Sequence, residues 1–466
     1  MDFDGFCPQL TKKYGPVFTI WLGAKPMVVI CGYEAVKDAL ITHNEEFGGR
    51  PPIVVFDHVT KGYGVIGKHE NWKTLRRFII STLQNFGMGK RSMAERVLEE
   101  AHCLVGRISS FEGDHTLKNY VPPLCVQYRV VLFLYLPHNN KTVRWCQPFD
   151  IIPGITAAID NNFIELLEIV KEFTSFFLSI PGMVCSALPN IMNFLPGPHK
   201  KVFSDCNKIF NFLRNNVDAH KKTLDLENPR DFIDCFLLKL EKEQGSTLLC
   251  IEDLVMSVFQ LFLAGTEGTA SAISYGLILL ARFPRVQAKA QKEIDELVGA
   301  DRALCMEDRM KLSYTNALIH EIVRFQQGTT ETFPRMTTQD VNFRGHLISQ
   351  GTIILPLWVS VHFDPLCWED PEKFDPGHFL NEKGEFQKKD AYLPFSAGKR
   401  SCPGEGMADM EVFLLLATLL QHFTFELILD PEDINLETLF MDLRKKGKHR
   451  YLRAIKHDIN LSSRNK

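Results

Sequence analysis

The sequence of 466 residues has no uninterrupted apolar run of about 18 residues or more, so no segment predicts a helix that spans a bilayer. It also has no strong net charge. Its 53 Lys and Arg stand against 56 Asp and Glu, and this balance gives a nucleic-acid partner no support. It has no Cys-x-x-Cys pair, and its 12 cysteines lack the spacings of a disulfide framework. We therefore expect a reducing compartment and mostly buried, inert thiols.

Signals for processing and for domain boundaries are scarce as well. The first residues, Met1–Phe6, are acidic and polar, and they resemble neither a signal peptide nor an anchor. No low-complexity linker divides the chain, and its 45% hydrophobic and 23% charged residues are typical of a globular protein with a large core. We expect a single domain over residues 1–466 that, as written, does not cross a membrane.

Helical periodicity dominates the chain, which predicts a mainly α class with small β-sheets. We expect helices over Tyr33–Asn44, Trp72–Leu83, Met93–Ile108, Ile251–Leu280, Leu312–Phe325 and Glu405–His422, and strands within Lys13–Gly23, Met27–Cys31 and Ile353–Val361. Gly49–Gly67 and Asp364–Phe379 are rich in Gly, Pro or Asp, so we expect loops there.

One cysteine stands in a distinctive setting. Cys402 lies in Phe395–Gly404, which reads Phe-Ser-Ala-Gly-Lys-Arg-Ser-Cys-Pro-Gly and directly precedes a predicted helix. The N-terminus of a helix favours a thiolate. A thiolate held in a stiff loop with one open face is a good axial ligand for haem iron. The alternative is a buried free cysteine in a glycine-rich loop.

The same decapeptide resembles the haem-binding signature of cytochromes P450, Phe-x-x-Gly-x-Arg-x-Cys-x-Gly, at every fixed position. Further segments, among them Phe47–Pro51, Asn85–Lys90 and Pro334–Thr338, are similar to the vertebrate microsomal type, family 2. The resemblance implies the P450 fold around a buried haem b whose iron Cys402 binds. It also implies a haem-thiolate monooxygenase that inserts one oxygen atom from O2 into a fatty acid, steroid or xenobiotic, using electrons from NADPH.

The resemblance further implies partners and a location. NADPH–cytochrome P450 reductase would supply electrons, with cytochrome b5 as a second donor, at the cytosolic face of the endoplasmic reticulum membrane. The anchor helix and proline-rich hinge with which such proteins usually begin are not found in this sequence. Lys73, Arg77 and their basic neighbours would form a face for an acidic donor, together with Lys399. Simple solvation of a charged helix face is the alternative.

Several residues are candidates for holding the haem. Trp72 and Arg76 stand one helical turn apart, so the indole N–H and the guanidinium point the same way. By resemblance they contact the haem propionates, as do Arg335 and Arg400, since Arg is the best bidentate partner for a carboxylate. The alternative is a solvated basic helix with a core tryptophan. Phe395 and Gly398 are the remaining fixed positions of the cysteine loop.

The segment Ala264–Thr269 resembles the stretch that activates oxygen in P450s, Ala-Gly-x-Glu/Asp-Thr-Thr/Ser. Glu267 matches the acid, but Gly268 replaces the usual threonine, and the next residue is Thr269. One more residue rotates a side chain by about 100° around the helix. Either water held at Gly268 replaces the hydroxyl in a leaky monooxygenase, or the enzyme needs no proton relay and rearranges peroxides.

A buried ion pair is also predicted. Glu321 and Arg324 lie three residues apart on one helix face, and in P450s this pair joins a polar residue of a downstream loop. We expect His378 to be that third member and the role to be structural.

An apolar substrate pocket is expected from five phenylalanines, each of which could equally be a core residue. These are Phe56, Phe259, Phe262, Phe333 and Phe440.

Residues 114–158 lack both the resemblance and clean helical periodicity. We interpret them as the product of an alternative reading frame, an exon or a gene-model error, with a divergent but real segment as the alternative. Peptides from Val130–Lys141 in the native protein would exclude the error.

Three other functions compete with this interpretation. A zinc hydrolase fails because His320-Glu321 is followed by Arg324 where a second histidine is needed. A phosphate-binding loop at Gly62–Lys68 fails because His69 replaces the Ser or Thr that binds magnesium. A catalytically impaired haem-binding splice variant is the non-enzymatic alternative.

Overall fold

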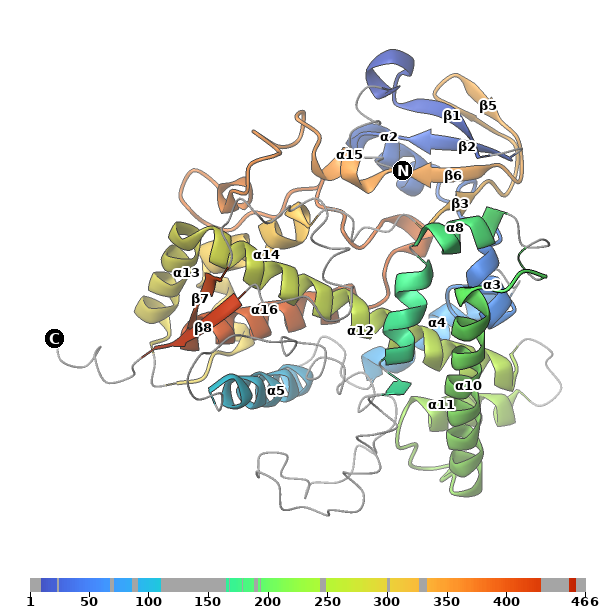
Figure 1. Ribbon diagram of the computed structural model, residues 1–466, viewed down its shortest axis with the longest axis horizontal. Coiled ribbons are helices and arrows are strands. Elements are labelled where there is room, and N and C mark those ends of the chain that lie inside the picture. The colour runs from blue at the N-terminus through green and yellow to red at the C-terminus, as the bar shows by residue number, and fades with distance from the viewer. Residues whose placement is uncertain are drawn as a thin grey trace. The chain divides into compact units, whose positions relative to one another are not determined.

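The computed structural model describes residues 10–22, 25–67, 71–85, 91–109, 165–166, 168–177, 179–187, 192, 194–243, 249–299, 302–326, 333–428 and 452–457 (Figure 1). Its contacts form two compact units. Unit 1 comprises Met1–Pro51, Gly89–Pro122 and Gly268–Lys466, and unit 2 comprises Pro52–Met88 and Pro123–Glu267. The long helix α12 (Ile251–Arg282) contributes to both. A single domain over the whole chain stays a prediction.

Unit 1 contains the sheets. Its strands are β1 (Val17–Leu22), β2 (Lys25–Ile30), β3 (Arg335–Met336), β4 (Val341–Phe343), β5 (His346–Ile348), β6 (Ile353–Pro356), β7 (Phe423–Leu427) and β8 (Leu452–Lys456). Four of them form a sheet in the order β1-β2-β6-β3 (Figure 1). The predicted antiparallel pair near the N-terminus is confirmed, with Val17 opposite Ile30. Strand β6 joins β2 in parallel, and β4–β5 and β7–β8 form two-stranded sheets.

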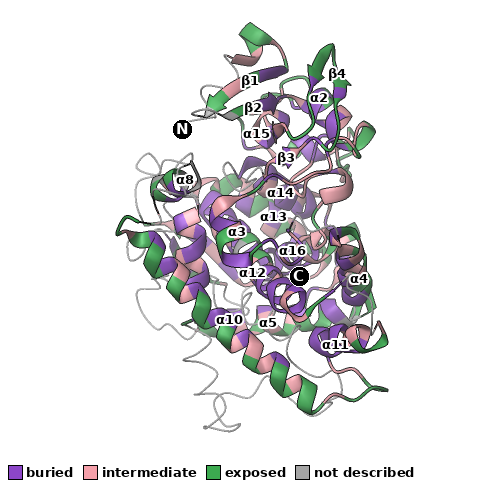
Figure 2. Cartoon of the chain, turned by 90° about the vertical axis from the view of Figure 1, so that its right-hand side faces the viewer, coloured by how far each residue is buried: buried purple, intermediate pink, exposed green. Residues whose placement is uncertain are grey.

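Helices make up the rest of unit 1. They are α2 (Tyr33–Lys37), α5 (Arg91–Ser109), α13 (Pro284–Leu297), α14 (Ser313–Phe325), α15 (Trp358–His362) and α16 (Glu405–His422), with short helical turns η1 (Asp38–Thr42), η2 (Met306–Met310), η3 (Pro376–Phe379) and η4 (Gly398–Arg400). Helix α16 is buried from Met410 to Gln421, so it forms the core of the unit (Figure 2). A Cβ at Gly276 of α12 would lie 3.1–3.3 Å from side-chain atoms of Ile322 and Leu416, so glycine permits close packing of α12, α14 and α16.

Unit 2 is built on phenylalanine packing. Its helices are α3 (Val54–Thr60), α4 (Trp72–Asn85), α8 (Ile180–Ala187), α10 (Pro198–Lys222), α11 (Phe232–Lys242) and the first half of α12. The ring of Phe259 in α12 lies 5.1 Å from that of Phe210 and 6.1 Å from that of Phe173. Helix α10 buries one face, with residues such as Val202, Ile209 and Leu213, and exposes the other (Figure 2).

The predicted class, mainly α with small sheets, is confirmed. Two local expectations were wrong. Gly49–Gly67 is not all loop, because Val55, Phe56 and Val59 bury one side of helix α3 in unit 2. The strand expected to reach Val361 ends at Pro356, and α15 follows because Trp358 and Val361 then share a buried face.

The atypical segment 114–158 and Phe440 lie outside the described residues. Within the described residues, no helix combines the length and the apolar composition that a bilayer crossing requires.

Candidate active site

The cysteine loop is closed by its own backbone. The N–H of Cys402 donates to the carbonyl of Phe395 at 2.8 Å, and α16 begins three residues later, at Glu405. Gly398 has φ +70°, and a Cβ there would collide with the carbonyl of Leu40, so no other residue fits. Cys402 itself is exposed. The predicted setting, a cysteine held open just before a helix, is therefore what the structure contains.

Two guanidinium groups lie at this loop, that of Arg400 within it and that of Arg335 on strand β3. Arg335, only 3% exposed, donates from Nη2 to the Ser396 hydroxyl at 2.7 Å and reaches the carbonyl of Arg400 at 3.5 Å. Arg400 donates from Nε to the carbonyl of Gly48 at 3.3 Å. A thiol with one fixed cation on its own loop and a second on the neighbouring strand β3 fits a group that has a metal ion and carboxylates, as haem does.

Trp72 and Arg76 belong to unit 2. As predicted they lie together, with the guanidinium 5.9 Å from the indole centroid. The indole N–H, however, donates to the carbonyl of Val65 at 2.7 Å, within unit 2 itself. A role of this pair at the haem propionates stays a prediction.

The oxygen-activation stretch lies in α12. A Cβ at Gly268 would meet no atom within 4 Å. Thr269, by contrast, is only 5% exposed. Its hydroxyl donates to Oε2 of Glu411 in α16 at 3.3 Å. Thr269 is thus turned toward the core, in keeping with the rotation between successive helical residues. The side chain of Glu267 lies outside the described residues.

Glu411 was missed by sequence reasoning. It is a single carboxylate in the otherwise apolar stretch Met410–Leu420, which also holds Thr418. It is only 4% exposed. An isolated acid in an apolar helix is a signal that a partner must exist, because a buried charge without one is costly.

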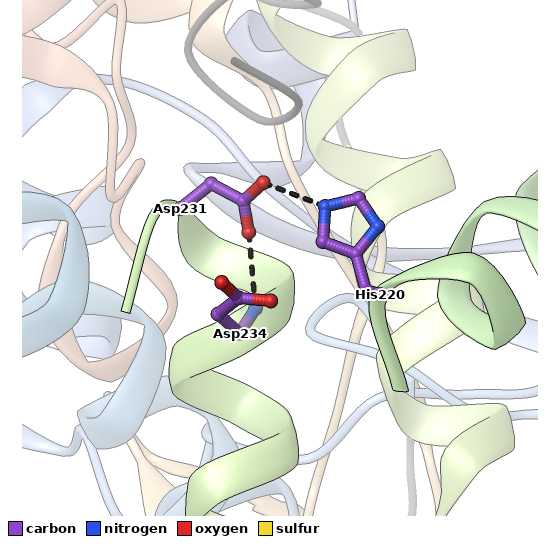
Figure 3. Close-up of side chains that lie close together, drawn as sticks. All are labelled: His220, Asp231 and Asp234. Atoms are coloured by element: carbon purple, nitrogen blue, oxygen red, sulfur yellow. Dashed lines mark hydrogen bonds and ion pairs between the residues drawn. The ribbon is translucent and has the colours of Figure 1, made fainter. Parts of the chain in front are cut away.

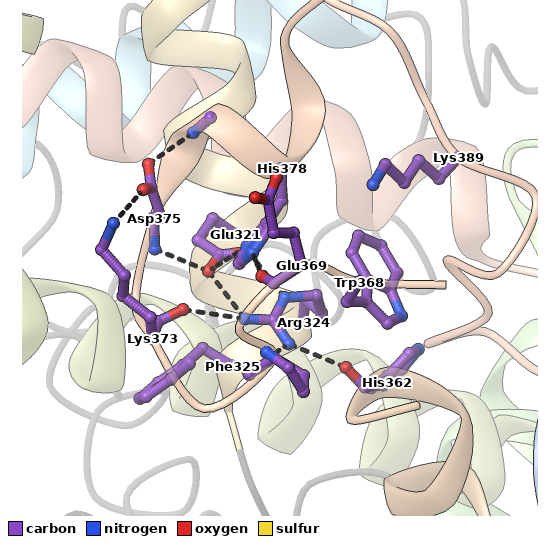
Figure 4. Close-up of polar contacts among 12 residues, drawn as sticks. Glu321, Arg324, Phe325, His362, Trp368, Glu369, Lys373, Asp375, His378 and Lys389 are labelled. Atoms are coloured by element: carbon purple, nitrogen blue, oxygen red, sulfur yellow. Dashed lines mark hydrogen bonds and ion pairs between the residues drawn. The ribbon is translucent and has the colours of Figure 1, made fainter. Parts of the chain in front are cut away.

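The predicted ion pair is confirmed and is fully buried (Figure 4). Arg324 donates from Nε and Nη2 to the two carboxylate oxygens of Glu321 at 2.7 and 2.8 Å. It also donates to the carbonyls of His362 and Pro371 at 2.7 and 2.9 Å. His378 is the third member, as expected, with Nδ1 3.1 Å from Oε1 of Glu321. The pair therefore ties α14 to the loop that precedes η3.

Among the described residues, one group brings three potential metal-ligating side chains together: His220, Asp231 and Asp234 in unit 2 (Figure 3). Their atoms already have other partners. Asp234 accepts from Nε and Nη2 of Arg230 at 2.6 and 2.9 Å. Asp231 accepts from the backbone N–H of Asp234 at 3.0 Å, which caps α11, and from His220 at 2.8 Å.

Burial lowers the pKa of His220, but its hydrogen bond to Asp231 and the charge of that carboxylate outweigh burial and raise the pKa overall. The cluster is therefore an ion pair and helix cap joining α10 to α11, rather than a metal site.

Known proteins that this chain resembles belong to one family. A family model described as "Cytochrome P450" matches residues 1–451. Cytochrome P450 2C16 of Oryctolagus cuniculus is 41% identical over 436 residues, which is 93% of this chain and 86% of that protein. Cytochrome P450 2C50 of Mus musculus is 41% identical over 444 residues and cytochrome P450 2C8 of Homo sapiens 40% over 446, each with the same two shares.

Proposed function

Because the chain belongs to the cytochrome P450 family of haem-dependent monooxygenases, we propose that Cys402 is its iron ligand and that its substrate is a small apolar molecule. The family resemblance expected from the motifs is confirmed. The observation that carries the proposal is the cysteine loop, in which Cys402 is exposed while its backbone is locked to Phe395.

Haem, when bound, supplies the activation of O2 for insertion of one oxygen atom. In the proposed arrangement Arg335 of β3 and Arg400 of the cysteine loop hold its propionates, and Trp72 and Arg76 do so from α4. Phe395 and Gly398 shape the loop, since the first closes its backbone and the second permits its turn.

Protons would be delivered along α12. We assign the acid to Glu267 and the water-holding position to Gly268, where a side chain would meet no neighbour. Thr269 is the second candidate for this role, but its hydrogen bond to Glu411 supports a different one, namely holding α12 against α16. The chemistry would then proceed with poor coupling, because water without a fixed hydroxyl is less well placed.

Gly268 also favours a second candidate function, the rearrangement of peroxides, which needs no proton relay. A catalytically impaired haem-binding protein is the third candidate. The monooxygenase is preferred because the motifs of the family, apart from this position, match the sequence in order.

The family implies a redox partner, and NADPH–cytochrome P450 reductase is the proposed one, with cytochrome b5 as a second donor. Lys73 and Arg77 are exposed on one face of α4, at i and i+4, which suits an acidic partner. Lys399 is less suited than expected because it pairs with Glu45. The family resemblance is the basis for proposing contact with the membrane surface at the cytosolic face of the endoplasmic reticulum. The exposed side chains of Trp21 in unit 1 and Phe194 in unit 2 suit contact with an apolar surface.

Fatty acids, steroids and xenobiotics are the proposed substrates. Phe56, Phe259 and Phe262 lie in one apolar cluster of unit 2, and they are 4%, 0% and 5% exposed. Phe333 belongs to unit 1, where it packs against the guanidinium of Arg50 at 5.4 Å. An apolar lining with few polar groups suits such ligands.

The test is turnover under labelled oxygen. Haem-loaded protein, reductase and NADPH are incubated with dodecanoic acid or progesterone under 18O2. One labelled oxygen atom in the product supports monooxygenation. Product formed from a hydroperoxide without NADPH or O2 would instead favour rearrangement, and absence of both would favour the impaired protein. Omission of the reductase is the control.

A further inference from the structure

The segment between α3 and α4 in unit 2 follows a well-fixed path. Lys61 is left-handed with φ 53°, and Gly62 and Gly64 have φ +82° and +86°. The backbone N–H of Gly67 donates to the carbonyl of Gly64 at 3.1 Å, which closes a tight turn. We refer to residues 61–67 as the α3–α4 loop.

The side chain of Gln260 in α12 is hydrogen-bonded to the backbone of this loop. It is fully buried, at 0% exposure. Its Oε1 accepts from the N–H of Ile66 at 2.8 Å, and its Nε2 donates to the carbonyl of Tyr63 at 2.8 Å. Only an amide offers a donor and an acceptor at this spacing, because an ionised carboxylate accepts only.

Two other contacts help to hold the loop. Asp253, which lies about two turns before Gln260 in α12, accepts from the N–H of Gly64 at 3.4 Å. The indole N–H of Trp72 donates to the carbonyl of Val65 at 2.7 Å. The backbone of the loop nevertheless lies closest to Gln260, since a Cβ at Gly64 would be only 2.6 Å from the amide atoms of that side chain. Glycine at position 64 and glutamine at position 260 therefore fit one another.

The loop carries apolar side chains into the phenylalanine cluster. Val65 is 7% exposed and belongs to the same cluster as Phe56, Phe259 and Phe262. Tyr63 and Ile66, the two residues that Gln260 binds, pack against it. Gln260 also follows Phe259 directly in α12. Its two hydrogen bonds therefore connect the parts of the cluster that come from α12 and from the α3–α4 loop.

We propose that Gln260 is a positioning residue that determines substrate selectivity by holding the α3–α4 loop against the phenylalanine cluster. The inference rests on the proposed function, in which this cluster lines the substrate site. With the loop held, the site favours slender apolar chains. With the loop released, the site accepts wider and more rigid molecules.

The chain offers a matched control for this role. Gln287 in unit 1 is also buried, at 1% exposure. Its Oε1 accepts from the N–H of Phe425 at 2.8 Å, and its Nε2 donates to the carbonyls of Phe425 and Leu280 at 2.9 and 3.3 Å. Gln260→Met and Gln287→Met therefore each remove a buried amide that both accepts from and donates to the backbone, and methionine keeps the side-chain length in both.

The first measurement is hydrogen exchange of the α3–α4 loop in haem-loaded protein. Removing both hydrogen bonds leaves the Ile66 amide without a partner, so Gln260→Met should exchange at Ile66 about tenfold faster or more. Gln287→Met should leave it unchanged. An Ile66 amide that exchanges equally in all three proteins overturns the proposal.

The second measurement is the ratio of the dissociation constants of progesterone and dodecanoic acid, from ligand-induced shifts of the haem spectrum. Gln260→Met should lower the ratio by about threefold or more relative to wild type, with no such change in Gln287→Met. A smaller change, or an equal change in the control, overturns the proposal. If Gln260→Met does not bind haem, Gln260→Glu replaces it, since it keeps the acceptor for Ile66 and loses the donor for Tyr63.

If neither variant binds haem, wild-type exchange decides. Under the proposal, the amide of Ile66 exchanges more slowly than the amide of Glu227. Glu227 is exposed, and its N–H donates to the side chain of Asp225. Equal exchange overturns it. A wild-type protein whose spectrum responds to neither ligand contradicts the proposed function instead, while exchange still reports on the contact made by Gln260.

Discussion

Single residues decide how well the proposed chemistry is coupled, and Gly268 matters most. The sequence alone predicted that Thr269 would point away from the direction of residue 268, because helical geometry demands it. It could not predict where Thr269 points instead, since Glu411 lies 142 residues later and only the packing of α12 on α16 brings the two together. The same holds for Gln260, whose partners are 194 and 197 residues earlier.

We predict that Gly268→Thr raises the amount of product formed per NADPH by about twofold or more. The added hydroxyl can hold the water that delivers protons, and such assistance is worth about 10²–10⁴-fold in favourable cases. The side chain has room, because a Cβ at Gly268 meets no atom within 4 Å. NADPH consumption and product are measured together, at equal haem content.

A better helix former could also act through stability alone. Gly106→Thr controls for this, since Gly106 lies in helix α5 and a Cβ there also meets no atom within 4 Å. An equal gain in both variants, or high wild-type coupling that Gly268→Thr leaves unchanged, would show that position 268 does not limit proton delivery.

At the scale of elements, long apolar or periodic segments were predictable and short ones were not. The apolar runs of α12 and α16 and the amphipathic period of α14 each extend over three turns or more, so sequence alone located these helices. Helices α3 and α15 have 7 and 5 residues, too few to display a period, and they form because tertiary contacts bury one side.

We predict that Glu321→Gln or Arg324→Met yields little haem-loaded protein. Each leaves one buried charge without its partner, which costs about 3–5 kcal/mol. The substitution Arg324→Met would also remove the donor to the carbonyls of His362 and Pro371. The ratio of haem absorbance to protein, measured after expression, reports the loss.

The control for this prediction is the surface pair Arg91–Glu95 on α5, whose side chains are 80% and 63% exposed. Because exposed pairs contribute little to stability, Arg91→Met should load haem normally. Normal loading of both α14 variants would mean that the buried network is dispensable for the fold.

At the scale of the whole molecule, stability should depend on pH through buried histidines of unit 1. Burial, aided by the charge of Arg324, lowers the pKa of His362 to about 3. Its Nε2 accepts from the N–H of Leu393 at 3.2 Å, which requires the neutral ring. Burial likewise lowers the pKa of His320 to about 3.

We therefore predict that the protein loses stability as pH falls from about 6.5 toward 3. In this window unfolded histidine binds a proton and folded His362 does not, so acid favours the unfolded state. The midpoint of urea unfolding, measured at pH 7 and pH 5, should drop. His362→Gln keeps an acceptor for Leu393 and should flatten the dependence, whereas His346→Gln, at an exposed histidine, should not. The same slope in all three proteins would contradict the account.

The family and the position of the cysteine loop were readable from the sequence because they rest on a short local motif. The distribution of the chain between two units was not, because it depends on contacts between distant segments such as β2 and β6. The parts of the candidate site that come from one loop were therefore predictable, and those that join distant segments were not.

The reduced, carbon-monoxide-bound absorption spectrum tests the central claim, ligation of the haem iron by Cys402, most directly. The wild type should show the red-shifted band that gives the family its name, and Cys402→Ser should lose it. Cys250→Ser, at another exposed cysteine, should keep it. A Cys402→Ser variant that retains the native band, or a wild type with a band only at shorter wavelength, would contradict thiolate ligation by this residue.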